Sequence, residues 1–347
     1  MSQFPLQFQI YSDLHLETPF TSPTYGHFSR AENLPIDASN LFLLGDIGCV
    51  RDEGLLIFLR LLLASTPNLK VYYVLGNHEA YGMSLDQAKK RLCEFEAEMR
   101  REYGERFWFM DKRRVDVSPT LTILGCTLWS HISYASEATC VRLLTDFNEY
   151  AGITGRTVEG HNTDHATDLA WLNEQFGEIE TSEPGREIIV LTHHCPTKDA
   201  RACDPRHVES NVREGFTSFL QNEPCWRSKN LKVWAFGHTH YNCRYLEQRE
   251  GDGAAEGVLV VANQKGYCGM KGQGNWKVER CVLEKGAEEW TILQDAGGRG
   301  KNKVEHKDVK AVGQLVLQES AREQGNAEKK SLFSRAEGKI KKELGCK

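Results

Sequence analysis

The feature of this chain that most restricts its fold is a set of five short polar motifs, most of which directly follow an apolar run. The apolar runs lie at residues 8–11, 41–44, 71–75, 188–191 and 233–236 and are rich in β-branched and aromatic residues. Such runs are typical of buried strands. In an open α/β sheet, functional groups gather beyond the carboxyl ends of the strands. We therefore expect an α/β protein in which one cleft collects all five motifs.

The motifs consist of residue types that bind metal ions. In chain order they are Asp13-Leu14-His15, Gly45-Asp46, Gly76-Asn77-His78-Glu79, His193-His194 and Gly237-His238-Thr239-His240. Carboxylate and amide oxygens mixed with imidazole nitrogens suit Mn, Fe or Zn, and the lack of thiolates in the motifs argues against a structural zinc site. A glycine before three of the motif residues permits sharp turns and close backbone approach. The candidate metal ligands are Asp13, His15, Asp46, Asn77, His193, His238 and His240.

The spacing within two motifs supports convergence on a common centre. Asp13 and His15 are two residues apart, as are His238 and His240. In extended chain, residues at this spacing point to the same face. His194 would then face away from His193, and a structural role for it is as probable as one near the substrate.

In order and composition, the five motifs resemble those of the calcineurin-like metallophosphoesterase superfamily, over roughly residues 7–268. The resemblance implies an α/β fold, a four-layer α-β-β-α sandwich with two mixed β-sheets and a dinuclear metal site at strand ends. It implies that Asp46 bridges the ions and that His78, a histidine that is not a ligand, acts on the leaving group or the transition state. Glu79 matches an acidic residue that orients this histidine. The ligand sets implied are Asp13, His15, Asp46 and His240 for one ion, and Asp46, Asn77, His193 and His238 for the other.

One position departs from the pattern of the superfamily. Cys49 stands where many members have a second Asp, which normally acts as a charge partner of the non-ligand histidine. Its loss is expected to change how readily His78 holds a proton. It also separates this chain from the familiar protein serine/threonine phosphatases.

The expected activity is hydrolysis of a phosphodiester or phosphomonoester by metal-activated water, with His78 and Asp46 as the catalytic residues. Two divalent ions can activate a water and stabilise an in-line displacement without a covalent intermediate. Neither a GxxxxGK[ST] nor a GxSxG motif is present, which argues against P-loop and serine-hydrolase chemistry. A small phosphorylated molecule or nucleotide is the favoured substrate. The alternatives are a phosphoprotein phosphatase and a catalytically silent metal-binding scaffold, against which the intact ligands argue.

Composition indicates a catalytic domain at residues 1–296 followed by a basic tail at 297–347. Of the 347 residues, 40% are hydrophobic, enough for a sizeable core. The N-terminus has no signal-like pattern and no apolar run is long enough to span a membrane, so we expect a cytoplasmic protein. The eleven cysteines form no CxxC pair, and reduced thiols are expected.

The tail has thirteen Lys and Arg against seven Asp and Glu, a formal charge of +6, which leaves −11 on the preceding body. Its composition is typical of a disordered or partly helical segment that keeps a protein soluble, and an acidic partner is possible. The acidic body argues against binding of long nucleic acid.

Several further segments are expected to contribute to the fold or to the cleft. Residues 85–103 have the periodicity of a helix, and residues 121–129, 258–263 and 290–293 that of strands. Residues 130–164 are expected to form loops and short helices that cap the cleft and select the substrate. Structural and substrate-binding roles both remain open for His131, Asp146, Asn263 and Tyr267.

Overall fold

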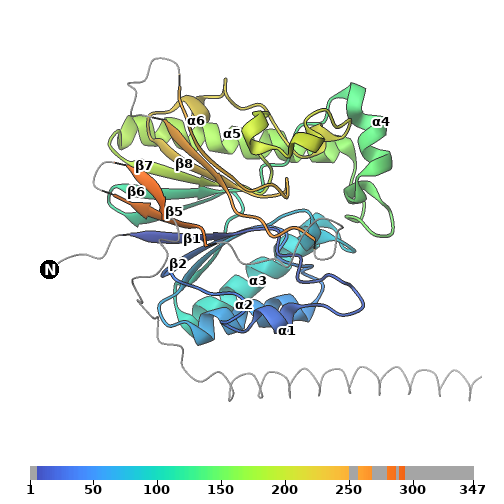
Figure 1. Ribbon diagram of the computed structural model, residues 1–347, viewed down its shortest axis with the longest axis horizontal. Helices are drawn as coiled ribbons and strands as arrows, with labels where there is room; N and C mark the ends of the chain where they lie inside the picture. Colours follow the sequence, from blue (N-terminus) through green and yellow to red (C-terminus); the bar gives the residue numbers. More distant parts are fainter. Residues whose placement is uncertain (1–5, 250–256, 268–279, 287–288, 294–347) are drawn as a thin grey trace, which may run out of the picture.

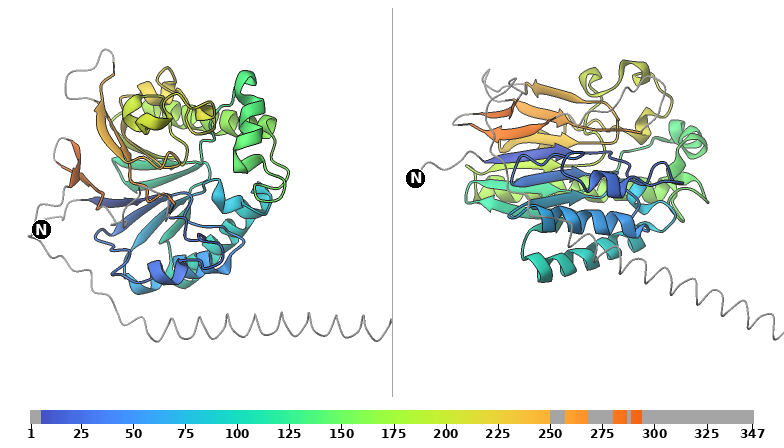
Figure 2. Two further views of the ribbon diagram at one scale, coloured as in Figure 1. Left: turned by 45° about the vertical axis from the view of Figure 1, so that its right-hand side comes forward. Right: turned by 60° about the horizontal axis from the view of Figure 1, so that its bottom comes forward.

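The protein is a four-layer sandwich in which two β-sheets face each other and helices cover the outer faces (Figures 1 and 2). This computed structural model describes residues 6–249, 257–267, 280–286 and 289–293. Each sheet has six strands, and each mixes parallel and antiparallel pairs. The expected fold class is therefore confirmed. The basic tail at 297–347 lies outside the described residues.

The first sheet has the strand order β12-β11-β1-β2-β3-β4. Strands β1 to β4 run parallel, whereas β11 and β12 add antiparallel pairs at one edge. The helices α1, α2 and α3 cover its outer face (Figure 1). The strands are β1 (Gln7–Tyr11), β2 (Asn40–Leu44), β3 (Lys70–Val74), β4 (Phe107–Phe109), β11 (Val282–Lys285) and β12 (Trp290–Leu293), and the helices are α1 (Tyr25–Phe28), α2 (Glu53–Ser65) and α3 (Leu85–Tyr103).

The second sheet has the strand order β5-β6-β7-β8-β10-β9, with a parallel centre and antiparallel edges. The helices α5 and α6 cover its outer face, and α4 stands beyond one end (Figure 1). The strands are β5 (Arg113–Ser118), β6 (Leu121–Gly125), β7 (Glu187–Leu191), β8 (Leu231–Phe236), β9 (Cys243–Glu247) and β10 (Val258–Ala262), and the helices are α4 (Tyr134–Leu143), α5 (Val158–Ser182) and α6 (Pro224–Arg227).

Strand periodicity builds the layers, because alternate residues of one strand enter different cores. In β2, Leu41 and Leu43 pack toward α2 and α3, whereas Phe42 and Leu44 join the core between the two sheets. In β8, Trp234 faces the helices α5 and α6 while Val233 enters the central core. Both faces of the central strands are thus buried, which explains their continuous apolar runs.

The predicted elements are confirmed where their periodicity is strong. The helix expected at residues 85–103 is α3, which begins at a capping box between Ser84 and Gln87. The strand expected at residues 121–129 ends earlier, at Gly125, because Leu128 has a left-handed backbone with φ +50° and its amide donates to Asp168.

The sequence did not predict the long helix α5. Only loops and short helices were expected over residues 130–164. Helix α5 begins at Val158 and buries His161, His165 and Asp168. These polar residues on the buried face interrupt the apolar periodicity by which an amphipathic helix is detected.

The topology brings the motifs to one edge of the sandwich. Parallel strands end at the same side of a sheet, so the segments after β1, β2 and β3 lie beside one another, as do those after β7 and β8. Among the helices that the structure describes, none is long and apolar enough to cross a membrane.

Candidate metal centre

Five of the seven predicted ligands lie in turns with a left-handed backbone. Asp13, His15, Asp46, His238 and His240 all have positive φ, between +47° and +69°. A left-handed backbone costs a residue with a side chain on the order of 1 kcal/mol and often marks a functional site. The expectation of extended chain at the two spaced pairs is therefore wrong. The residues of each pair converge because a left-handed turn, and not a continuing strand, follows the last strand residue.

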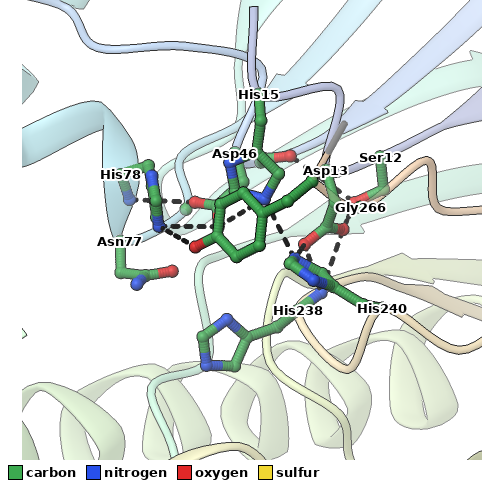
Figure 3. Close-up of polar contacts among 12 residues, drawn as sticks. Ser12, Asp13, His15, Asp46, Asn77, His78, His238, His240 and Gly266 are labelled. Atoms are coloured by element: carbon green, nitrogen blue, oxygen red, sulfur yellow. Dashed lines mark hydrogen bonds and ion pairs between the residues drawn. The ribbon is translucent and has the colours of Figure 1, made fainter. Parts of the chain in front are cut away.

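These turns bring the candidate ligands into two groups that share Asp46. Figure 3 shows the first group together with Asn77, His78 and His238. Within each group, one ligand atom from every residue lies within 4.8 Å of the others. The amide oxygen of Asn77 lies 3.1 Å from Nε2 of His193, next to the second group. The first group consists of Asp13, His15, Asp46 and His240, and the second of Asp46, His193 and His238.

The Asp46 carboxylate faces both groups with different oxygens. Its Oδ1 lies 3.4 Å from Nε2 of His193, and its Oδ2 lies 3.8 Å from Nε2 of His15. The backbone amide of His78 donates to Oδ1 at 2.9 Å and holds the carboxylate in place. Burial, followed by the neighbouring charges of Glu79 and Asp13, raises the pKa of Asp46 well above its usual range. A bound cation would offset this cost of a buried negative charge.

In three of the histidines, one ring nitrogen faces an acceptor of the protein and the other faces the cleft. The acceptor determines which nitrogen carries the proton and which carries a lone pair. Nδ1 of His15 lies 3.2 Å from the Glu17 carboxylate, and Nδ1 of His193 lies 2.8 Å from the carbonyl oxygen of Leu44. Because both acceptors require a proton on Nδ1, the Nε2 atoms of both rings carry lone pairs. In His238 the order is reversed, since Nε2 faces the carbonyl oxygen of Gly215 at 3.3 Å and Nδ1 faces the cleft.

The buried imidazoles are held in the neutral form that metal binding requires. Burial lowers the pKa of His15 to about 3, and the Glu17 contact offsets only part of this shift. Burial also lowers the pKa of His193 and of His238. Imidazole lone pairs and carboxylate oxygens thus converge on one space, and a cation is the group that fits this set.

The amide of Asn77 is oriented by two neighbours. Its Nδ2 donates to the Asp146 carboxylate at 2.8 Å and to the Tyr81 hydroxyl at 2.9 Å. The Tyr81 hydroxyl also donates to Asp146, at 2.6 Å. The amide oxygen is left to face His193, so Asp146 acts on the centre through Asn77. This contact accounts for the burial of Asp146, whose role the sequence left open.

The side chain of His78 is held at both ring nitrogens. Nδ1 lies 2.9 Å from the carboxylate of Glu17, and Nε2 lies 2.8 Å from the hydroxyl of Tyr267. Glu17 is fully buried and bonds both His15 and His78. Glu17 therefore places a carboxylate beside His78. The thiol of Cys49, at the position where a second Asp was considered, cannot do this. The sequence reasoning missed Glu17, although its position two residues after His15 was a usable signal.

The expectation that Glu79 orients His78 is wrong. Its two carboxylate oxygens accept hydrogen bonds from the backbone amides of Asp46, Ile47 and Gly76 and from the Tyr73 hydroxyl, at 2.7–2.9 Å. Glu79 therefore shapes the turn that carries Asp46. Glu79 thus affects the candidate metal centre by positioning the backbone of this turn.

Glycine is required where these turns meet. A Cβ atom on Gly76 would lie 2.3 Å from Oδ1 of Asp46, and one on Gly237 would lie 2.1 Å from the Ser12 hydroxyl. Both contacts are far shorter than real Cβ atoms tolerate. The glycines that precede Asn77 and His238 therefore permit the close backbone approach expected from the sequence.

His194 and Asn263, whose roles the sequence left open, contact other parts of the protein. His194 is fully buried, and its ring lies 4.2 Å from that of His238 and 5.2 Å from that of Trp129. Asn263 donates to the carbonyl oxygen of Ile10 and ties β10 to β1. The cysteines in the described part of the chain are free thiols.

Comparison with known proteins agrees with this geometry. Residues 7–242 match the sequence model of the calcineurin-like phosphoesterase family. An uncharacterized protein, L509, from Acanthamoeba polyphaga mimivirus is 25% identical over 245 residues, which cover 67% of this chain and 80% of the viral protein.

Two solved structures are among the matches. The phosphopantetheinyl hydrolase of Mycobacterium tuberculosis has a TM-score of 0.52 at 18% identity, covering 76% of this chain and 90% of its own. A dimetal phosphatase from Danio rerio has a TM-score of 0.46 at 12% identity, covering 84% and 99%. Because the family model spans most of the sandwich, the chain belongs to the calcineurin-like phosphoesterase family and is a hydrolase of phosphoester bonds.

Proposed function

We propose that the protein hydrolyses a small phosphorylated molecule or nucleotide, a phosphodiester or phosphomonoester, at a centre of two divalent metal ions. The observation that carries this proposal is the pair of ligand groups that share Asp46. When bound there, two cations would lower the pKa of a water enough to give hydroxide near neutral pH and would offset the charge of the phosphoryl oxygens. Mn, Fe or Zn suit the mixed oxygen and nitrogen donors.

The ligand assignment follows the two groups. Asp13, His15 and His240 would hold one ion, Asn77, His193 and His238 the other, and Asp46 would bridge them. The lone pairs of His15 and His193 at Nε2, and of His238 at Nδ1, support this division because hydrogen bonds on the opposite ring nitrogens direct them into the cleft.

His78 is proposed to act on the phosphate and not on the metals. Glu17 accepts a hydrogen bond from Nδ1 and holds the ring, while Nε2 faces the cleft and contacts the Tyr267 hydroxyl. From Nε2 the ring can donate a proton to the leaving group or a hydrogen bond to a phosphoryl oxygen. Tyr267 lies where its hydroxyl can contact the same oxygen.

A small substrate is supported by the shape of the cleft. A pocket of about 430 Å³ is lined in part by Asp46, Asn77, His78, His238 and His240. This volume lies in the range of pockets that enclose small organic ligands. It favours a small phosphoester over the side chain of a folded phosphoprotein.

Other proposals concern the chain as a whole. We propose that residues 1–296 form one catalytic domain, since β11 and β12 complete the sheet that β1 begins. A cytoplasmic location and an acidic partner for the tail stay predictions.

The test is a parallel assay of the purified protein loaded with Mn, Fe, Zn or Mg. The substrates are p-nitrophenyl phosphate, bis(p-nitrophenyl) phosphate and a phosphoserine peptide. Faster turnover of the bis ester assigns a phosphodiesterase, and faster turnover of the monoester a phosphomonoesterase. A preference for the peptide would identify the alternative, a phosphoprotein phosphatase. Bound metal without hydrolysis of any substrate would identify a silent scaffold and overturn the proposal.

A further inference from the structure

The lining of the pocket extends beyond the candidate metal ligands. One wall of this extension is the end of α4 with the turn that follows, residues 143–146, and the other is the loop at residues 203–217. Helix α4 stands outside the sandwich (Figure 1), so the extension lies between a projecting helix and a loop.

Part of the lining of this extension is apolar. Leu143, Leu144, Val212 and Phe216 line the pocket together with the candidate metal ligands. Leu143 is 57% exposed. The ring of Phe216 is stacked on that of His238 with centroids 4.6 Å apart, and joins the apolar wall to the metal ligands. An apolar group that entered here would cover Leu143 while its phosphate reached the centre.

The two arginines that line the extension make contacts within the protein. The Arg206 guanidinium binds the Asp204 carboxylate at 2.6 Å. The terminal nitrogens of Arg213 donate to the backbone carbonyl oxygens of Val208 and Lys198 at 3.0 and 2.5 Å. Because these acceptors already engage both guanidinium groups, we expect the four apolar side chains to make the main contact with the organic group of a ligand.

The apolar wall is held in place before any ligand binds. Leu144 and Val212 pack against a small separate core of Ile132, Cys140 and Val158. The loop is tied to the start of α4, because the amide and hydroxyl of Ser133 donate to the Glu214 carboxylate at 2.9 and 2.6 Å. A preformed wall avoids the entropic cost of ordering a loop on binding.

We propose that this extension, defined by Leu143, Leu144, Val212 and Phe216, is a subsite for an uncharged apolar organic group of the phosphoester substrate. The inference rests on the proposed function, because it places the phosphate at the metal ligands. It adds that substrates with a bulky apolar group are preferred over those with a small or anionic one.

The test measures binding of phosphonates, which are not hydrolysed, to the metal-loaded protein by isothermal titration calorimetry. Phenylphosphonate is expected to bind at least about tenfold more tightly than methylphosphonate, because even one methylene in an apolar pocket is worth that much. Leu143→Ser and Val212→Ser are each expected to reduce this ratio by about threefold or more. Val141→Ser is the matched control, because Val141 lies on the same helix, is 47% exposed and does not line the pocket.

The outcomes separate the subsite from the activity. A phenyl-to-methyl ratio near one, or equal ratios in the Leu143 and Val141 variants, would overturn the subsite even if the enzyme hydrolyses phosphoesters. Tighter binding of 4-carboxyphenylphosphonate than of phenylphosphonate would do so too, because it would mean that the wall recognises charge. Selective phenylphosphonate binding without hydrolysis of any ester would support the subsite while the proposed activity fails.

Discussion

Replacing Glu17 with Gln is expected to weaken one metal site more than the other. The Glu17 carboxylate is fully buried and lies 3.2 Å from Nδ1 of His15 and 2.9 Å from Nδ1 of His78. Burial opposes its charge, but the two imidazole contacts outweigh burial and lower its pKa to about 2. The carboxylate is therefore ionised at any ordinary assay pH, and Glu17→Gln removes a charge without a large change in shape.

The magnitude follows from the contacts that are lost. A hydrogen bond to a charged group contributes about 1.5–3 kcal/mol, and loss of an outer hydrogen bond to a metal-bound histidine costs about 10–100-fold in metal affinity. Glutamine keeps one carbonyl oxygen that can accept from one of the two rings. We therefore expect a loss of about tenfold at the site that contains His15. The site that contains His193 and His238 has no contact with Glu17 in the described structure and is expected to change much less.

The assay is a two-site metal titration by calorimetry, together with elemental analysis of the purified variant. Glu96→Gln is a matched control, because Glu96 is also a buried carboxylate, but it pairs with Arg113 away from the cleft. Circular dichroism checks that both variants are folded. A folded Glu17→Gln protein with unchanged affinity at both sites, or with equal losses at both, would refute the reasoning.

The remaining predictions concern the bridge, the catalytic residues and the tail. Asp46→Asn should reduce occupancy of both metals, measured by elemental analysis; a folded variant with two metals and full activity would rule out the bridge. Asp146→Asn should lower affinity by about tenfold at the site next to Asn77, since the amide loses its charged acceptor; an equal loss at both sites in a metal titration would contradict this role. His78→Ala should keep both metals and lose about 10²–10⁴-fold in kcat, and unchanged turnover would remove it from the mechanism. Removal of residues 297–347 should leave turnover of p-nitrophenyl phosphate largely intact; a folded, metallated truncation that has lost most of its turnover would show that the tail contributes to catalysis.

Where local patterns are strong, they were sufficient to predict the elements and the candidate site. The apolar runs before Asp13, Asp46 and His238 are strands because both faces of a central strand are buried in a four-layer fold. Parallel strands end at the same edge, so the order of the motifs along the chain was enough to predict that their side chains meet. Helix α5 escaped prediction because its buried face carries His161, His165 and Asp168.

The sequence by itself therefore determined the strands, the family resemblance and the set of candidate ligands, because strand periodicity and residue chemistry are local properties. Only the tertiary structure decided which neighbours support those ligands. Glu17 bonds His78 across 61 positions of sequence and Asp146 bonds Asn77 across 69, whereas Glu79, adjacent to His78, bonds other groups. No local pattern encodes such pairs, since the partner of a buried polar group depends on which distant segments the packed sheets bring within hydrogen-bonding distance.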